Sequence, residues 1–64
     1  MTTAADLYPR PGEFERLIED AEENAKGIWE EEFTESMRSR FDRHGVHMQV
    51  SILQVEKLEQ IASR

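Results

Sequence analysis

Residues 44–55, HGVHMQVSILQV, contain the end of one helix and the start of another. Gly45 tolerates positive φ and follows a basic stretch that ends at His44, which is a common composition for a helix C-terminus. Ser51 and Gln54 have the spacing of a capping box, in which the two residues satisfy each other's exposed backbone donors. This stretch therefore predicts a helix, a short connection and a second helix.

Upstream of this stretch, apolar residues recur every three or four positions, which predicts one long helix over residues 13–44. Gly27 costs about 1 kcal/mol inside a helix, so it marks a kink, a break or a close crossing of two backbones. We expect a continuous helix with a bend at this glycine. The second helix is predicted over residues 52–63, and the short connection makes the two helices antiparallel neighbours. The expected fold is all-α, with a helical hairpin domain over residues 13–64.

The predicted hairpin covers one part of its apolar surface and leaves another part uncovered. The second helix packs over the later half of the long helix, giving a core of Trp29, Phe33, Met37, Phe41, Val55, Leu58 and Ile61. The earlier half carries an apolar seam that has no neighbour in the same chain: Phe14, Leu17, Ile18, Ala21, Ala25 and Ile28. Small domains without disulfides or metals are often stabilised by self-association. We therefore expect a homodimeric bundle that covers this seam.

Residues 1–12 are predicted to form a flexible N-terminal arm. Pro9 and Pro11 favour extended backbone. Leu7 and Tyr8 are the bulky apolar groups of this arm, and they are candidates for contact with a partner.

Charge is distributed unevenly along the chain. Residues 1–36 hold eleven acids and three bases, a net charge of −8, whereas residues 37–64 hold five bases and three acids, a net charge of +2. The total of −6 is opposite to the balance typical of nucleic-acid-binding proteins. Arg38, Arg40 and Arg43 nevertheless leave a nucleic-acid accessory role open. An acidic balance favours a basic partner, or it simply keeps the chain soluble.

The sequence contains no pattern typical of a catalytic, cofactor-binding or metal-binding site. The densest carboxylates, from Glu30 to Glu35, lie side by side on a predicted helix, without a nucleophile or a glycine-rich loop nearby. His44 and His47 are separated by Gly45, and the chain has no cysteine to join them. No apolar run is long enough to span a membrane, which favours a cytoplasmic protein. We expect a non-enzymatic protein without cofactors.

Much of the sequence resembles a helical segment that recurs in small phage and prophage proteins. The matching positions, within residues 17–64, are Trp29, Glu30, Phe33, Phe41, Gly45, Ser51, Gln54, Leu58, Ile61 and Ala62. His44 stands where an aromatic residue is common, and Val50 stands where leucine is usual. The resemblance implies an accessory protein made in the host cytoplasm during phage infection. Some such proteins inhibit host regulators, as anti-quorum-sensing and anti-CRISPR proteins do.

We therefore expect a homodimeric interaction protein that binds a host protein with a basic surface and blocks its activity. The candidate partner-binding residues are Leu7, Tyr8, Glu30, Glu31 and Glu35. Occlusion of a partner needs only a complementary surface, which suits a chain without catalytic groups. The alternatives are a nucleic-acid accessory protein and a component of a larger phage assembly.

Overall fold

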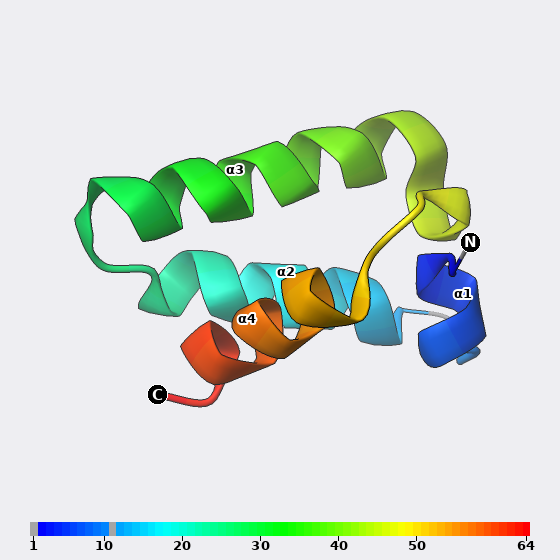
Figure 1. Ribbon diagram of the computed structural model, residues 1–64, viewed down its shortest axis with the longest axis horizontal. Coiled ribbons are helices and arrows are strands. Elements are labelled where there is room, and N and C mark those ends of the chain that lie inside the picture. Colours follow the sequence, from blue (N-terminus) through cyan, green and yellow to red (C-terminus); the bar gives the residue numbers. More distant parts are fainter. Residues whose placement is uncertain (1, 11) are drawn as a thin grey trace.

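Residues 2–10 and 12–64, which the computed structural model describes, form four α-helices and one short 3-10 helix (Figure 1). The elements are α1 (Ala4–Leu7), α2 (Glu13–Asn24), α3 (Gly27–His44), η1 (Gly45–His47) and α4 (Ile52–Ala62). Within the described residues, extended pairing is limited to an isolated antiparallel bridge between Thr3 and Gln49. The predicted all-α class is confirmed.

The predicted single helix over residues 13–44 is wrong, because the chain reverses direction between α2 and α3 (Figure 1). Ala25 and Lys26 are extended, with ψ of 131° and 133°, and Gly27 has a φ of +82°. A continuous α-helix needs φ of about −63° and ψ of about −42° at each of these residues. Positive φ is accessible to glycine because it has no Cβ. As a result, α3 runs back along α2 instead of extending it.

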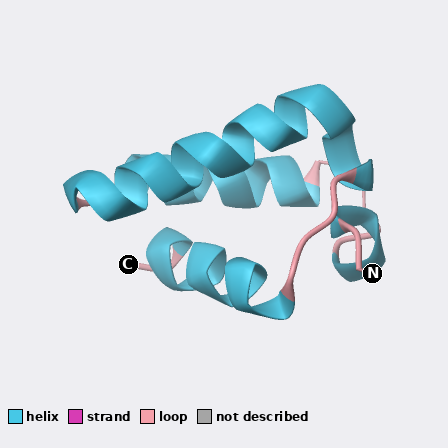
Figure 2. Ribbon diagram, turned by 45° about the horizontal axis from the view of Figure 1, so that its top comes forward, coloured by secondary structure: helices cyan, strands magenta, loops and turns pink. Residues whose placement is uncertain are grey.

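The central helix of the fold is α2, with α3 and α4 lying beside it (Figures 1 and 2). The most extensive contacts of α4 are with α2, whereas the sequence predicted that it packs over the later half of a long helix. At the far ends of these two helices, the Asn24 side chain donates a hydrogen bond of 3.0 Å to the carbonyl of Ala62. The predicted two-helix hairpin is therefore replaced by a packing of three helices, in which α3 and α4 lie against α2.

The predicted dimer seam lies mostly inside a single chain. Its fully buried members are Phe14, Ile18 and Ala21, each 0% exposed. Leu17 and Ala25 are partly buried against the same core, whereas Ile28 is 77% exposed. Because α3 and α4 cover α2, the fully buried side chains of Phe14, Ile18 and Ala21 cannot form an interface between copies of the folded chain. Homodimerisation itself stays a prediction, but it would need another surface.

Most of the residues predicted to form the core are buried or partly buried, but Trp29 in the first turn of α3 is not. The buried ones are Met37, Val55, Leu58 and Ile61, and Phe33 and Phe41 are partly buried against them. Trp29, in contrast, is 60% exposed, so its assignment to the core is wrong. It lies eight residues before Met37, and at about 100° per residue it points about 80° away from that buried side chain.

The predicted flexible arm is instead tied to the rest of the chain over residues 2–8, while residues 1 and 11 lie outside the described residues. The Asp6 carboxylate accepts the backbone N–H of Thr3 at 3.0 Å, and this hydrogen bond lowers the pKa of Asp6. Ala4 is 0% exposed, and its N–H donates to the carbonyl of Met48 at 3.0 Å. This bond ties α1 to the connection that precedes α4.

The two helix boundaries around that connection agree with the sequence prediction. α3 ends at His44, and Gly45, with a φ of +59°, donates its N–H to the last turn of the helix. The Ser51 hydroxyl accepts the N–H of Gln54, and the Gln54 side chain accepts the N–H of Ser51, both at 3.1 Å. The capping box is therefore confirmed, and α4 ends at Ala62, one residue before the predicted end.

Candidate protein-binding surfaces

Among the described residues, no group of three or more His, Asp or Glu side chains is placed to hold a metal ion. The helices in the described ranges are also too short or too polar to cross a membrane. His44 and His47 are both exposed. Contiguous exposed apolar side chains are a more informative signal of function than scattered surface charges.

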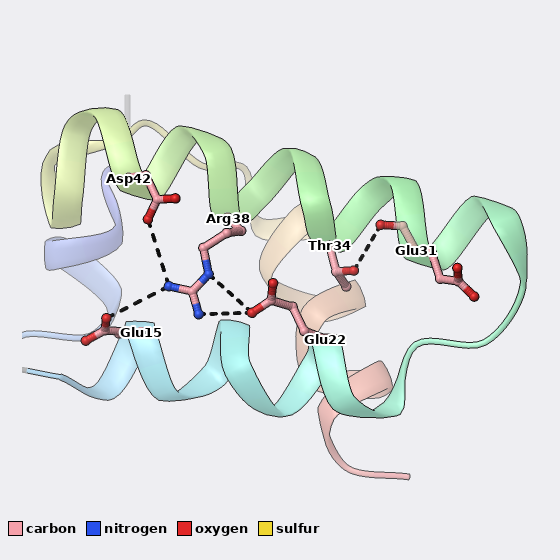
Figure 3. A network of polar contacts seen from close by, with 6 residues as sticks. All are labelled: Glu15, Glu22, Glu31, Thr34, Arg38 and Asp42. Atoms are coloured by element: carbon pink, nitrogen blue, oxygen red, sulfur yellow. Dashed lines mark hydrogen bonds and ion pairs between the residues drawn. The ribbon is translucent and has the colours of Figure 1, made fainter.

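An ionic network connects α2 to α3 through Arg38 (Figure 3). The Arg38 guanidinium donates two hydrogen bonds to one carboxylate oxygen of Glu22, at 2.9 and 3.2 Å. It also lies 3.9 Å from a Glu15 oxygen and 4.0 Å from an Asp42 oxygen. The hydrogen bond with Glu22 raises the pKa of Arg38. This arginine therefore holds two antiparallel helices together.

The basic patch proposed for nucleic acid is largely used inside the protein. Arg38 is engaged by carboxylates of α2 and α3, and Arg40 donates a hydrogen bond to the carbonyl of Gln49. Arg43 is exposed near the end of α3. Carboxylates thus neutralise the charge of Arg38, whereas the Arg40 guanidinium is held by a neutral carbonyl and Arg43 is exposed.

The outer side of the first half of α3 combines exposed apolar and acidic side chains. We call this surface the α3 face; it consists of Ile28, Trp29, Glu31, Glu32 and Glu35. Ile28 and Trp29 are 77% and 60% exposed, and all three glutamates are exposed. Ile28, Glu32 and Glu35 follow one another at i, i+4 and i+7, so they lie along one side of the helix.

Two neighbouring side chains hold Trp29 in place at the edge of the α3 face. Its ring stacks on Phe33, with centroids 5.4 Å apart and planes inclined by 6°. From α4, the Lys57 ammonium lies 5.2 Å from the centroid of the indole ring. A cation over an exposed aromatic ring contributes about 0.5–1 kcal/mol. These contacts restrict the rotation of an indole that solvent reaches on its remaining side.

Glu30 differs from the other glutamates predicted to bind a partner, because it turns toward the protein. Its carboxylate accepts two hydrogen bonds of 2.5 Å from the Arg64 guanidinium and one of 2.9 Å from the N–H of Lys26. The hydrogen bonds from Arg64, and then the one from Lys26, lower the pKa of Glu30. This carboxylate therefore fixes the start of α3, whereas Glu31 and Glu35 remain available on the surface.

Leu7 and Tyr8 belong to a second surface, which we call the α1–α4 groove and which consists of two adjoining hollows. The first has a volume of about 330 Å³ and is lined by Leu7, Tyr8, Ile52, Val55, Glu56 and Glu59. The second has a volume of about 400 Å³ and is lined by Tyr8, Glu13, Arg16, Leu17, Asp20 and Glu59. Tyr8 and Glu59 line both hollows.

A hydrogen bond between the two shared residues joins the end of α1 to α4. The Tyr8 hydroxyl donates to the Glu59 carboxylate. Burial raises the pKa of Tyr8, and the hydrogen bond to Glu59 raises it further. The Tyr8 ring also packs against Phe14, with centroids 5.7 Å apart. The groove is therefore attached to the core through Tyr8.

Sequence reasoning assigned no role to Ile52 and Leu53, although they are 54% and 77% exposed. The buried stripe of α4 passes through Val55, Leu58 and Ile61. Leu53 lies five residues before Leu58, which places it about 140° away around the helix. The spacing of Leu53 from the buried stripe therefore already indicated a surface position. Ile52 carried a similar signal, because it lies six residues before Leu58 and therefore about 120° away around the helix.

No family model matches this chain, and searches of the curated proteins and of the solved structures also find no match.

Proposed function

We propose that this chain is a non-enzymatic interaction protein that binds another protein through the α3 face and thereby modulates or blocks the partner's activity. The observation that supports this proposal is the exposed pair Ile28 and Trp29, at 77% and 60%, beside the glutamates of the same helix. Tryptophan is enriched among the interface residues that contribute most to binding.

Preorganisation strengthens this reading. Trp29 already stacks on Phe33 and lies under Lys57, so binding would order fewer side-chain rotations than it would for a free indole. Glu30 connects the same turn of the helix to Arg64 near the end of the chain. A partner would therefore meet an anchor held on a fixed helix turn.

The charge of the α3 face indicates the kind of partner. Glu31, Glu32 and Glu35 are exposed on the helix that presents the apolar anchors, and the whole chain has a net charge of −6. Complementarity then favours an apolar pocket surrounded by lysine or arginine on the partner. In line with the resemblance to small phage proteins, we propose a host regulatory protein as this partner.

Capture of a partner by tagged protein from host lysate tests the proposal, and Ile28 and Leu53 provide a matched pair because both are 77% exposed. We expect Trp29→Ala to weaken binding of the captured protein about thirtyfold, as for a central interface residue that contributes about 2 kcal/mol. Ile28→Ala should also weaken binding, whereas Leu53→Ala should not. A partner that binds the Trp29→Ala and Leu53→Ala variants equally well would contradict the proposal.

A further inference from the structure

The α1–α4 groove is a second surface, made of two shallow hollows, that the proposed function does not use. Its first hollow is formed by the end of α1 and the first half of α4, and its second by α2 and α4. Because Tyr8 and Glu59 line both hollows and are hydrogen-bonded to each other, the groove continues across three helices. The hydrogen bond and the packing of Tyr8 on Phe14 form it before any partner arrives.

The floor of the groove is apolar and accessible. Ile52 is 54% exposed and Leu7 is 36% exposed. Tyr8 and Leu17 are partly buried and extend the apolar surface along the groove, and the buried Val55 lines its first hollow. Grooves of this type bind the apolar side of a helix, whose side chains recur at i, i+3 and i+4.

The rim of the groove is acidic. Four carboxylates line the two hollows, those of Glu13, Asp20, Glu56 and Glu59, against a single guanidinium, that of Arg16. Glu59 keeps its interaction with Tyr8, and Arg10 lies 3.8 Å from Glu13, so Glu56 and Asp20 provide the remaining negative charge. A ligand that places cations on both sides of an apolar stripe would match this distribution.

We propose that the α1–α4 groove binds a basic amphipathic helix, with its leucine-like side chains on Leu7, Tyr8 and Ile52 and its lysine or arginine side chains toward Glu56 and Asp20. This site shares no residue with the α3 face. The protein would then have two binding surfaces, the α3 face, which presents Ile28 and Trp29 to a partner, and the α1–α4 groove, which receives a helix.

The neighbours Ile52 and Leu53 allow a sharp test. Ile52→Asp and Leu53→Asp add the same charge at adjacent exposed positions in the first turn of α4, where an acid is favourable to the helix. Only Ile52 lines the groove. The probe is a synthetic helix with leucine on one side and lysine on the other, labelled for fluorescence anisotropy. A version with glutamate in place of lysine is the control peptide.

We expect saturable binding of the basic helix, no binding of the acidic one, and amide shifts in NMR spectra centred on Leu7, Tyr8 and Ile52. Ile52→Asp should weaken binding about tenfold although it adds attractive charge, and Leu53→Asp should change it by less than about twofold. Trp29→Ala should leave it unchanged, which separates this site from the proposed function.

Several results would overturn the proposal. Equal effects of Ile52→Asp and Leu53→Asp would show that charge alone attracts the peptide. Amide shifts centred on Ile28 and Trp29 would place the peptide on the α3 face. A dimer that forms without peptide and dissociates in Ile52→Asp would show that a second copy of the chain occupies the groove.

Discussion

The apolar stripe of α2 and the first turn of α3 contain similar side chains in opposite surroundings. Phe14 and Ile18 are 0% exposed, whereas Ile28 and Trp29 are 77% and 60% exposed. In the sequence they belong to one run of apolar residues at helical spacing. The chain reverses at residues 25–27, after which α4 covers only the earlier part of the run. Helical spacing identifies an apolar stripe, but the path of the backbone decides which part of it is covered.

This difference separates stability from binding. Full burial of a side chain such as Phe14 or Ile18 contributes about 1.5–3 kcal/mol to folding. Ile28 and Trp29 remain largely in water, so most of the corresponding free energy is still available for an interaction with a partner. The same type of residue thus supports the fold in α2 and the proposed interface in α3.

The largest effect is expected when the same substitution is made in each region. Ile18→Asp places a carboxylate in a fully buried site and should destabilise the protein by about 4 kcal/mol or more. Ile28→Asp changes an exposed side chain in the first turn of a helix, so it should alter the free energy of unfolding by less than about 0.5 kcal/mol. Urea denaturation followed by circular dichroism measures both.

Two outcomes would remove this contrast. Similar destabilisation by both variants would mean that Ile28 is covered as Ile18 is. A folded Ile18→Asp protein that has only lost a partner subunit, measured by light scattering, would restore the dimer seam predicted from the sequence.

An intermediate effect on stability is expected at Gly27, where the chain reverses. The sign of the stability change there distinguishes a reversal from a continuous helix. Gly27 has a φ of +82°, which an L-residue adopts at a cost of about 1–2 kcal/mol. Gly27→Ala should therefore destabilise the protein by about that amount. In a continuous helix the same substitution would stabilise it by about 1 kcal/mol, because alanine favours the helix more than glycine does.

The cause of the Gly27→Ala effect can be isolated, because a Cβ at this position would meet nothing within 4 Å. The expected loss is thus conformational and not due to a clash. A D-alanine at position 27, introduced by chemical synthesis, accepts positive φ and should be close to neutral. Equal losses with L-alanine and D-alanine would point to a steric cause.

The sequence predicted local features best where short-range chemistry determines them. The capping box of Ser51 and Gln54 and the stop at Gly45 depend on a few neighbouring residues, and the structure has both. The all-α class follows from the helical spacing of apolar residues in the same way. The burial of Leu58 and Ile61 could also be read from the spacing along α4.

The reversal could not be predicted with the same certainty. Gly27 was identified as a place where the helix could bend or end, but Ala25 and Lys26 are good helix formers and gave no reason to leave the helix. Their extended backbone is favoured by contacts that form only after folding, such as the bond from Asn24 to Ala62. The wrong burial predicted for Trp29 and the wrong dimer seam both followed from the prediction of one continuous helix over residues 13–44.

Helix α1 was not predicted from the sequence, for a different reason. Thr3 and Asp6 have capping-box spacing, but the predicted arm gave more weight to the two prolines that follow. The candidate surfaces were predicted in part: Tyr8 and Leu7 line the groove, and Glu31 and Glu35 are exposed on the α3 face. Ile28 and Trp29 were assigned to the wrong surroundings because their exposure depends on the reversal.

The smallest effect on stability is expected at Tyr8, whose ring covers Phe14 in the first turn of α2. The Tyr8 ring packs on Phe14, and its hydroxyl donates a hydrogen bond to Glu59. Tyr8→Phe keeps the ring and removes the hydrogen bond, so it should cost about 0.5 kcal/mol near neutral pH.

The raised pKa of Tyr8 means that the folded state favours the neutral phenol. Its contribution is complete below the ordinary tyrosine pKa of 10.0 and is lost as the pH rises above that value. The difference in unfolding free energy between the native protein and Tyr8→Phe should therefore shrink, and then change sign, in alkaline solution. Because Tyr8 is the only tyrosine, tyrosinate absorbance also reports its ionisation directly. A titration midpoint that is the same in the folded protein and in urea would show that Tyr8 does not cover Phe14, and the first turn of α2 would then resemble the exposed first turn of α3.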